Sequence, residues 1–351
     1  MQSSQNPLSE GWADRVKGVL RALRTRYSSR YLVRRIGSMI IVFIFVLILN
    51  FVLPHLMPGN FVLIYIEQLK RTHPGIPGNK LAGRIEAVYG LNIPIWDQFM
   101  LYLKNIFSLN PNFGPSFEYY PLSAWYVVLY ALPWTLLLLG VSQAISWVAG
   151  IFLGIWLSFR KGKPVDKAIQ PGFYFLNSTP GFWIGLVFIF LFAVEFHLFP
   201  PAGAYGLHET VTSILYHMVL PLTVIVLISL PSHTLVIRSV ALEVLGSDYI
   251  QAMKAQGLSR RVITSRVMRN SFLPSLTNLA LSIGYLIGGI FTIEYTFSYP
   301  GMGTIIANAI LNDDYPVIEA ALYLTTLVVL LANLAADLLY PIVDPRVSYA
   351  D

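Results

Sequence analysis

Residues 248–274, DYIQAMKAQGLSRRVITSRVMRNSFLP, form a polar and basic segment between two long apolar stretches. Asp248 and Gln251 have the spacing of a capping box, which predicts a helix that begins at Tyr249. We expect this helix to end at Gly257, because a glycine in the left-handed conformation lets the chain turn sharply. Ser259 can then cap a second, basic helix that ends before Pro274. The pattern therefore predicts a short protruding helix, a tight turn and a helix that leads into the next apolar stretch.

The rest of the chain has the composition of a membrane protein. Of its 351 residues, 55% are hydrophobic and only 12% are charged, whereas about 25% are charged in a typical soluble domain. Apolar runs of about 20 residues, the length that crosses a bilayer, recur along the chain. We predict an all-α polytopic membrane protein with six transmembrane helices, at Ile36–Leu53, Tyr126–Phe159, Phe173–Leu198, Leu215–Ile237, Leu273–Ile293 and Val317–Tyr340.

The distribution of basic residues predicts the orientation. With the N-terminus inside, 19 of the 24 Lys and Arg residues face the cytoplasm and 5 face outward, so both termini should be cytoplasmic. The predicted parts are a basic arm (1–35), the first helix (36–53), an extracytoplasmic subdomain (54–125), a transmembrane core (126–341, with the polar region 243–274) and a cytoplasmic tail (342–351). The net charge of +6 reflects this bias and contact with the lipid bilayer, and it does not indicate nucleic-acid binding.

The predicted helix at 248–258 has two physical interpretations. Tyr249, Ala252 and Met253 share one face of it, together with Gln256. An exposed face of this kind fits either a groove on a partner protein or the inner surface of the bilayer. The residues alone leave both interpretations open.

The same segment resembles the coupling region of ATP-binding-cassette (ABC) importer permeases, and most of all that of the first permease subunit of dipeptide/oligopeptide importers. The resemblance lies in the acidic-aromatic start Asp248-Tyr249 and in the Gly257-Leu258 turn, whereas Gln251 stands where other importers carry the Glu of a Glu-Ala-Ala motif. Further matches occur at Ser178–Trp183, at Glu294 with Pro300-Gly301 and Gly303, and at Asp314–Pro316, Asn333, Asp337 and Asp344–Arg346.

The resemblance implies a role for particular residues. The ATPase-coupling residues would be Asp248, Tyr249, Ala252, Met253, Ala255, Gly257 and Leu258, and the possible gate or family-motif residues would be Glu294, Pro300, Gly301, Gly303 and Asp337. It also implies a second homologous permease subunit, two cytoplasmic ATPases that bind ATP and Mg, and an extracytoplasmic solute-binding protein, all at a prokaryotic cytoplasmic membrane. The chain itself should be non-catalytic and bind no cofactor or metal, because it has no phosphate-binding loop, no cysteine and no histidine cluster.

Several alternatives remain at this level. The solute would be a peptide, but an oligosaccharide or a metal chelate is also compatible with the resemblance. An aromatic-rich outer segment suits either sugar stacking or an interfacial belt; its residues are Tyr102, Phe113, Phe117, Tyr119, Tyr120 and Trp125. An ion-coupled secondary transporter is disfavoured by the scarcity of mid-membrane charge. An intramembrane hydrolase is disfavoured because the apolar stretches contain no paired Asp or Ser–His set.

Overall fold

The computed structural model describes residues 29–55, 93–108, 110–206 and 208–343. Within these residues the regular structure is helical, apart from one isolated bridge between Pro115 and Ser123. The described part thus confirms the all-α prediction. Most of the predicted arm (1–35), residues 56–92 of the outer subdomain and residues 344–351 of the tail lie outside the described residues.

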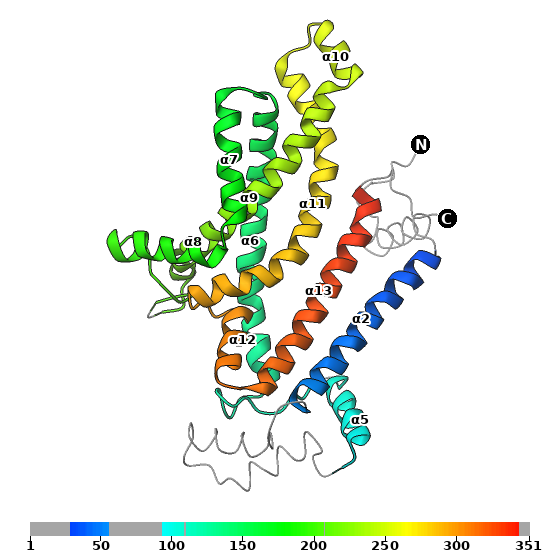
Figure 1. The fold of residues 1–351 in the computed structure, drawn as a ribbon, viewed down its shortest axis with the longest axis vertical. Helices are drawn as coiled ribbons and strands as arrows, with labels where there is room; N and C mark the ends of the chain where they lie inside the picture. Colours follow the sequence, from blue (N-terminus) through cyan, green and yellow to red (C-terminus); the bar gives the residue numbers. More distant parts are fainter. Residues whose placement is uncertain (1–28, 56–92, 109, 207, 344–351) are drawn as a thin grey trace, which may run out of the picture.

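The long helices run along the length of the molecule, and several short helices lie at its two ends. Their bounds are α2 Ser29–His55, α5 Ile95–Ile106, α6 Ala124–Ser158, α7 Pro164–Ser178, α8 Gly181–Phe188, the π-helix η1 Ile189–Glu195, α9 Val211–Gly246, α10 Asp248–Ala255, α11 Arg260–Thr296, α12 Met302–Leu311 and α13 Tyr315–Val343. The α6–α7 hairpin and α10, both predicted to be cytoplasmic, lie at the top of Figure 1, and α5 and the start of α13 lie at the bottom. The α6–α7 hairpin and α10 are therefore at the opposite end of the molecule from α5 and the start of α13.

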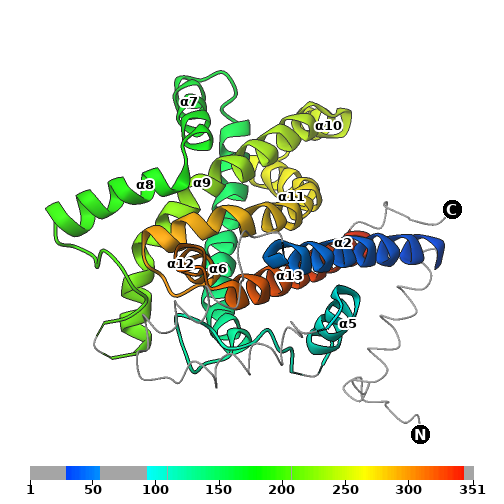
Figure 2. The same cartoon turned by 60° about the horizontal axis from the view of Figure 1, so that its bottom comes forward.

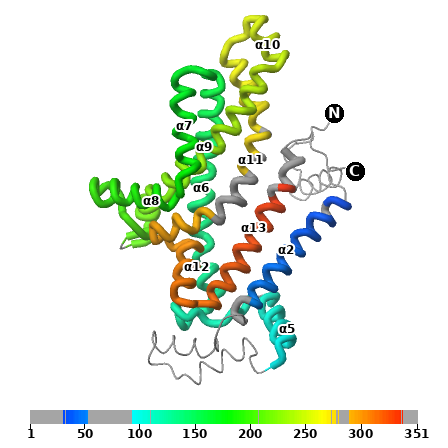
Figure 3. The backbone as a smooth tube through the Cα atoms, viewed as in Figure 1, coloured from blue at the N-terminus to red at the C-terminus, as the bar shows by residue number. Residues whose placement is uncertain are grey.

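Four described helices are long and apolar enough to cross a membrane. They are Val33–Val52, Ala124–Ser158, Val211–Gly246 and Tyr315–Ala335, and they coincide with four of the six predicted helices. The predicted helix Leu273–Ile293 falls inside α11, where the side chains of residues 280–288 lie outside the description. Figure 3 shows the first and last of these helices, α2 and α13, side by side.

The predicted helix Phe173–Leu198 is wrong as a single rod, because the chain bends by 102° between α7 and the α8–η1 pair. Thr179 has an extended conformation, with φ −92° and ψ 129°, and Pro180 follows it as the N-cap of α8. The ring of a proline disfavours the helical conformation of the residue before it, which explains the break. As a result, α8 projects from the side of the bundle (Figures 1 and 2).

Other prolines do not break their helices. Pro133, Pro221 and Pro231 lie inside continuous helices, and α11 runs through Pro274. The predicted helix end before Pro274 is therefore wrong, and the basic segment and the apolar segment after it form one helix of 37 residues. In membrane helices the freed carbonyl can be satisfied by its surroundings, so a proline is tolerated there.

The core is organised around α6, which lies in the middle of Figure 2. Residues of α6 take part in three buried apolar clusters, one towards each end and one between them. Gly150 and Gly154 allow close contact with α9, because an added Cβ would lie 2.6 Å from His233 Cβ and 2.7 Å from Ile237 Cβ respectively. The close packing that these small residues allow fixes α6 and α9 as the central pair.

The aromatic outer segment belongs partly to the core. Phe113 and Phe117 are 2% and 3% exposed. The Phe113 ring lies 5.4 Å from that of Tyr323 on α13, and Trp125 packs against the same ring at 6.0 Å. Neither Phe113 nor Phe117 is available for sugar stacking or for an interfacial belt.

Candidate functional site

Helix α10 lies at one extremity of the molecule, between the ends of α9 and α11 (Figure 1). Ile250 anchors it, because this side chain is fully buried in the cluster that joins α6, α9 and α11. Tyr249 and Leu258 are 44% and 40% exposed, and Ala252 and Ala255 are also exposed. The predicted coupling residues thus form an exposed surface, and the anchor is a residue that the sequence analysis did not name. The sequence does single out this residue, because Ile250 is the one branched aliphatic residue of the helix.

The start of α10 differs from the prediction. The helix begins at Asp248, its N-cap is Ser247, and no side chain caps it. Gln251 does not complete a capping box, because its amide donates to the carbonyl of Leu245 instead. Ser259 is the N-cap of α11, as predicted, although its hydroxyl makes no capping bond.

The turn after α10 confirms the conformation predicted for Gly257. This glycine has φ +72°. The Leu258 N–H donates to Met253 O at 3.2 Å, and the Gly257 N–H donates to Lys254 O at 3.0 Å. These two bonds define a Schellman motif, in which a left-handed residue satisfies the last carbonyls of a helix. The turn directs the chain from α10 into α11.

Tyr249 and Met253 face α11 as well as solvent. The Asn270 amide donates a hydrogen bond to the Tyr249 hydroxyl, which connects α10 to α11. Met253 is half-buried against the cluster around Ile250. Part of the predicted apolar face therefore packs against α11, and the rest is exposed to solvent.

Glu294 organises the turn between α11 and α12. It is fully buried, and its Oε2 accepts the Gly303 N–H at 2.7 Å. A Cβ at Gly301 would lie 2.3 Å from Glu294 Oε1, and one at Gly303 would lie 2.3 Å from the Phe291 Cα. Gly301 is needed because the turn passes close to this carboxylate, and Gly303 is needed because the turn passes close to the α11 backbone. Pro300, half-buried, lies in the same turn. The structure brings these motif residues together and assigns them packing contacts, and their role as a gate stays a prediction.

Asp337 lies apart from that turn. It forms an ion pair with Arg35, which joins α13 to α2 near their predicted cytoplasmic ends. This contact ties the first described helix to the last, which fits interhelical bonding for a carboxylate at this depth.

A buried ion pair that the sequence analysis did not identify joins α7 to α9. Asp166 is 2% exposed, and Arg238 contacts it through Nε at 2.9 Å and through Nη2 at 2.8 Å. The Gly162 N–H and the Gln170 amide also donate to Asp166, both at 3.0 Å. The sequence had shown Arg238 only as one of many basic residues at the inner side. Two charges 72 positions apart could be paired only by the fold.

Asp314 connects the outer segment to the start of α13. Its Oδ2 accepts the Ser116 hydroxyl at 2.5 Å and the N–H groups of Phe117 and Glu118 at 2.9 and 3.1 Å, while Oδ1 accepts the Val317 N–H at 3.4 Å. Burial raises the pKa of this carboxyl above its ordinary value, and the four donors oppose that shift by favouring the charged form.

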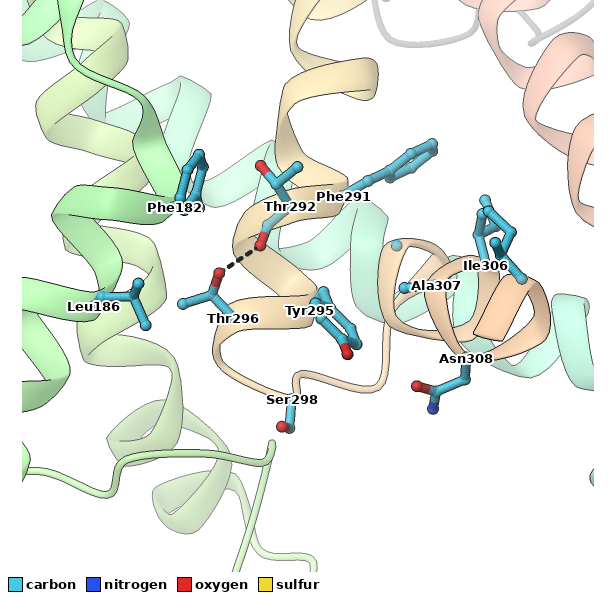
Figure 4. Close-up of a pocket in the computed structure, with 12 residues that line it drawn as sticks. Phe182, Leu186, Phe291, Thr292, Tyr295, Thr296, Ser298, Ile306, Ala307 and Asn308 are labelled. Atoms are coloured by element: carbon cyan, nitrogen blue, oxygen red, sulfur yellow. Dashed lines mark hydrogen bonds between the residues drawn. The ribbon is translucent and has the colours of Figure 1, made fainter. Parts of the chain in front are cut away.

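A groove of about 800 Å³ lies among α8, α11 and α12. Figure 4 shows Phe182 and Leu186 on one side and Ile306 and Asn308 on the other, with Tyr295 between them. None of the described residues that line it is charged. Hydroxyl groups supply part of its polar surface, and that of Thr296 donates to the Thr292 carbonyl at 2.7 Å. An uncharged wall of aromatic, aliphatic and hydroxyl groups can contact a solute without strong selection for its charge.

The described residues contain no group of three His, Asp or Glu side chains that could hold a metal ion. The long apolar helices, together with a helix exposed at one end of the molecule, fit a multi-pass membrane protein.

Comparison with known proteins identifies the family. Residues 150–349 match the inner membrane component of binding-protein-dependent transport systems. The chain is 31% identical over 324 residues to the oligopeptide transport system permease protein AppB of Bacillus subtilis, across 91% of this chain and 99% of that protein. It is 29% identical over 344 residues to the dipeptide transport system permease protein DppB of Escherichia coli K12, with the same two coverages. It is also 30% identical over 342 residues to the di/tripeptide transport system permease protein DppB of Pseudomonas aeruginosa, across 91% and 98%. The chain belongs to the family of inner membrane permeases of peptide ABC importers.

Proposed function

We propose that this chain forms half of the path by which an ABC importer carries peptides inward, and that α10 docks on the cytoplasmic ATPases. Similarity to permeases named for peptide transport, along nearly the whole chain, supports the cargo. The observation that carries the docking role is the exposed surface of Tyr249, Ala252, Ala255 and Leu258 on a helix held firmly by Ile250.

We extend this proposal to the topology. Six crossings, by α2, α6, the bent α7–α8 pair, α9, α11 and α13, would leave both termini in the cytoplasm. Two observations support it: the basic bias of the predicted inner segments, and the position of the α6–α7 hairpin and α10 together at one end of the molecule (Figure 1). The outer segment and the α12 turn would then face the solute-binding protein.

Docking on a protein is favoured over lying on the bilayer. Helix α9 continues from the end of its predicted membrane stretch at Ile237 to Gly246, which adds roughly 13 Å at 1.5 Å per residue. Helix α10 therefore lies beyond the lipid surface, where a helix that lies on the membrane would not be placed.

In the proposed cycle, two ATPases bind ATP and Mg, close, and push α10. Because Ile250, Tyr249 and the Gly257 turn hold α10 to α9 and α11, the push would move these helices as a unit. The Arg238–Asp166 pair would carry the motion to α7. This chain and a second homologous permease would then alternate between states that differ in their contacts, with nucleotide favouring one. The groove among α8, α11 and α12 is our candidate for this chain's part of the solute path.

Peptides are favoured over oligosaccharides as cargo. The main sequence argument for sugars was the aromatic outer segment, and Phe113 and Phe117 of that segment are buried in the core. The groove offers hydroxyl and amide groups beside apolar side chains, which suits a peptide of mixed composition.

The test is to purify the tagged chain with its partners from native membranes and reconstitute the complex in liposomes. ATP hydrolysis is then measured with the binding protein plus either a peptide mixture or an oligosaccharide mixture. We expect stimulation by peptides. Stimulation by sugars alone would refute the cargo, and an intact preparation without an ATPase partner or hydrolysis would refute the docking role of α10.

A further inference from the structure

A second cavity, of about 490 Å³, lies between α10 and α11 at the same end of the molecule. Tyr249 and Met253 line it from α10, and Arg266, Arg269 and Asn270 line it from α11. We call these five residues the basic notch. It adjoins the proposed docking surface, since Tyr249 belongs to both.

Within the described residues, neither arginine of the notch has an ion-pair partner. Arg266 and Arg269 are exposed and three positions apart, so they share one face of α11. In the described part of the chain, the ion pairs join Arg35 to Asp337 and Arg238 to Asp166, and no Asp or Glu is within ion-pair distance of either notch arginine. Nearby, the Asn270 amide is engaged with the Tyr249 hydroxyl, which holds the two walls together.

The direction of these side chains favours a protein partner over lipid. In an α-helix the Cα–Cβ bonds incline towards the N-terminus. The N-terminus of α11 is at the α10 end, so the Cα–Cβ bonds of Arg266 and Arg269 incline towards α10. The notch shares Tyr249 with the exposed surface of α10, so a protein that docks on that surface would also meet the two arginines.

We propose that the basic notch binds an acidic side chain, Asp or Glu, of the cytoplasmic ATPase that docks on α10; this inference rests on the proposed function. A carboxylate can accept two parallel N–H bonds from a guanidinium, so two arginines fix its position closely. The exposed apolar residues of α10 would supply contact area, and the notch would supply orientation and specificity. The carboxylate would thus set the register between the two proteins.

The first experiment reverses the charge of the notch. The double variant Arg266→Glu/Arg269→Glu and the control Arg261→Glu are expressed as full chains, and the ATPase that co-purifies is measured against ionic strength. Arg261 is exposed on the same helix but does not line the notch. We expect the double variant to lose at least about tenfold in apparent affinity for the ATPase, the scale of a removed interfacial charge pair. The control should match the wild type. Equal recovery of the second permease subunit would show that the variants are folded.

The second experiment identifies the partner atom. Arg266→Lys and Arg269→Lys keep the charge and introduce an amine that a zero-length carbodiimide couples to a carboxylate in direct contact. We expect mass spectrometry to find a cross-link from either lysine to an Asp or Glu of the ATPase, and none from Arg261→Lys. Wild-type and double-variant complexes are also compared in nanodiscs with and without anionic lipid.

The outcomes separate the two proposals. If the wild type binds the ATPase and the double variant binds it equally well without a cross-link, the notch proposal is refuted and α10 docking stands. If the wild type loses the ATPase when anionic lipid is removed and no cross-link forms, the notch binds lipid headgroups, which also refutes the proposal. If the wild type binds no ATPase at all, the proposed function fails with it.

Discussion

Replacing Gly257 by valine tests whether the turn after α10 is needed for docking. Gly257 has φ +72°, and no atom lies within 4 Å of the position of an added Cβ. The expected effect therefore comes from the backbone conformation and not from a collision. Tertiary contacts elsewhere should be unaffected, so insertion into the membrane should be normal.

The magnitude follows from the two ways in which the chain could respond. If the turn is kept, valine must adopt the left-handed conformation, which costs about 2 kcal/mol for a β-branched residue. If the turn opens, the two bonds from Leu258 N–H and Gly257 N–H to the end of α10 are lost, at about 1 kcal/mol each. Either response disfavours the docking-competent turn by about 2 kcal/mol, or roughly 30-fold in population.

The assay is co-purification of the ATPase together with peptide uptake. Gly257→Val should lose most of both, and Gly257→Asn should retain them, because asparagine tolerates the left-handed conformation. Gly246→Val is the matched control, since Gly246 also faces open space but has no left-handed backbone. Wild-type binding and uptake by Gly257→Val would refute the requirement for this turn.

Three further predictions concern the packing contacts. Arg238→Leu should leave Asp166 buried without its cation and lower the unfolding free energy by about 3–5 kcal/mol, which a lower midpoint of thermal unfolding in detergent would show. The double variant Arg238→Leu/Asp166→Asn should recover part of this loss, and no recovery would contradict the pairing. Gly303→Ala should destabilise the α11–α12 turn, because the new methyl would meet the α11 backbone at 2.3 Å, whereas Gly289→Ala, which meets nothing within 4 Å, should leave the unfolding midpoint unchanged. Asp314→Ala should expose the outer segment to limited proteolysis, because it removes the acceptor of the three donors in that segment, Ser116, Phe117 and Glu118, at a cost of about 2–3 kcal/mol; wild-type cleavage rates would contradict this role.

The sequence by itself determined the class of fold and the position of the exposed helix α10. Hydrophobic runs of bilayer length and the bias of basic residues are local properties of the chain, so they predict helices and their orientation without knowledge of packing. The turn at Gly257 was also predictable, because a left-handed residue is a local requirement. The residues resembling the family motifs after Asp248 directed attention to the same segment.

Only the tertiary structure decided which prolines break a helix and which charges are paired. Pro180 interrupts the chain between α7 and α8, while Pro274 lies within a continuous α11. This difference depends on what surrounds the freed backbone groups, which the sequence does not state. Asp166 and Arg238 are 72 positions apart, and the notch arginines remain unpaired within the described chain. Contacts between distant residues depend on how the helices pack. Periodicity and motif spacing carry no information on that packing, so the buried ion pair and the basic notch required the structure.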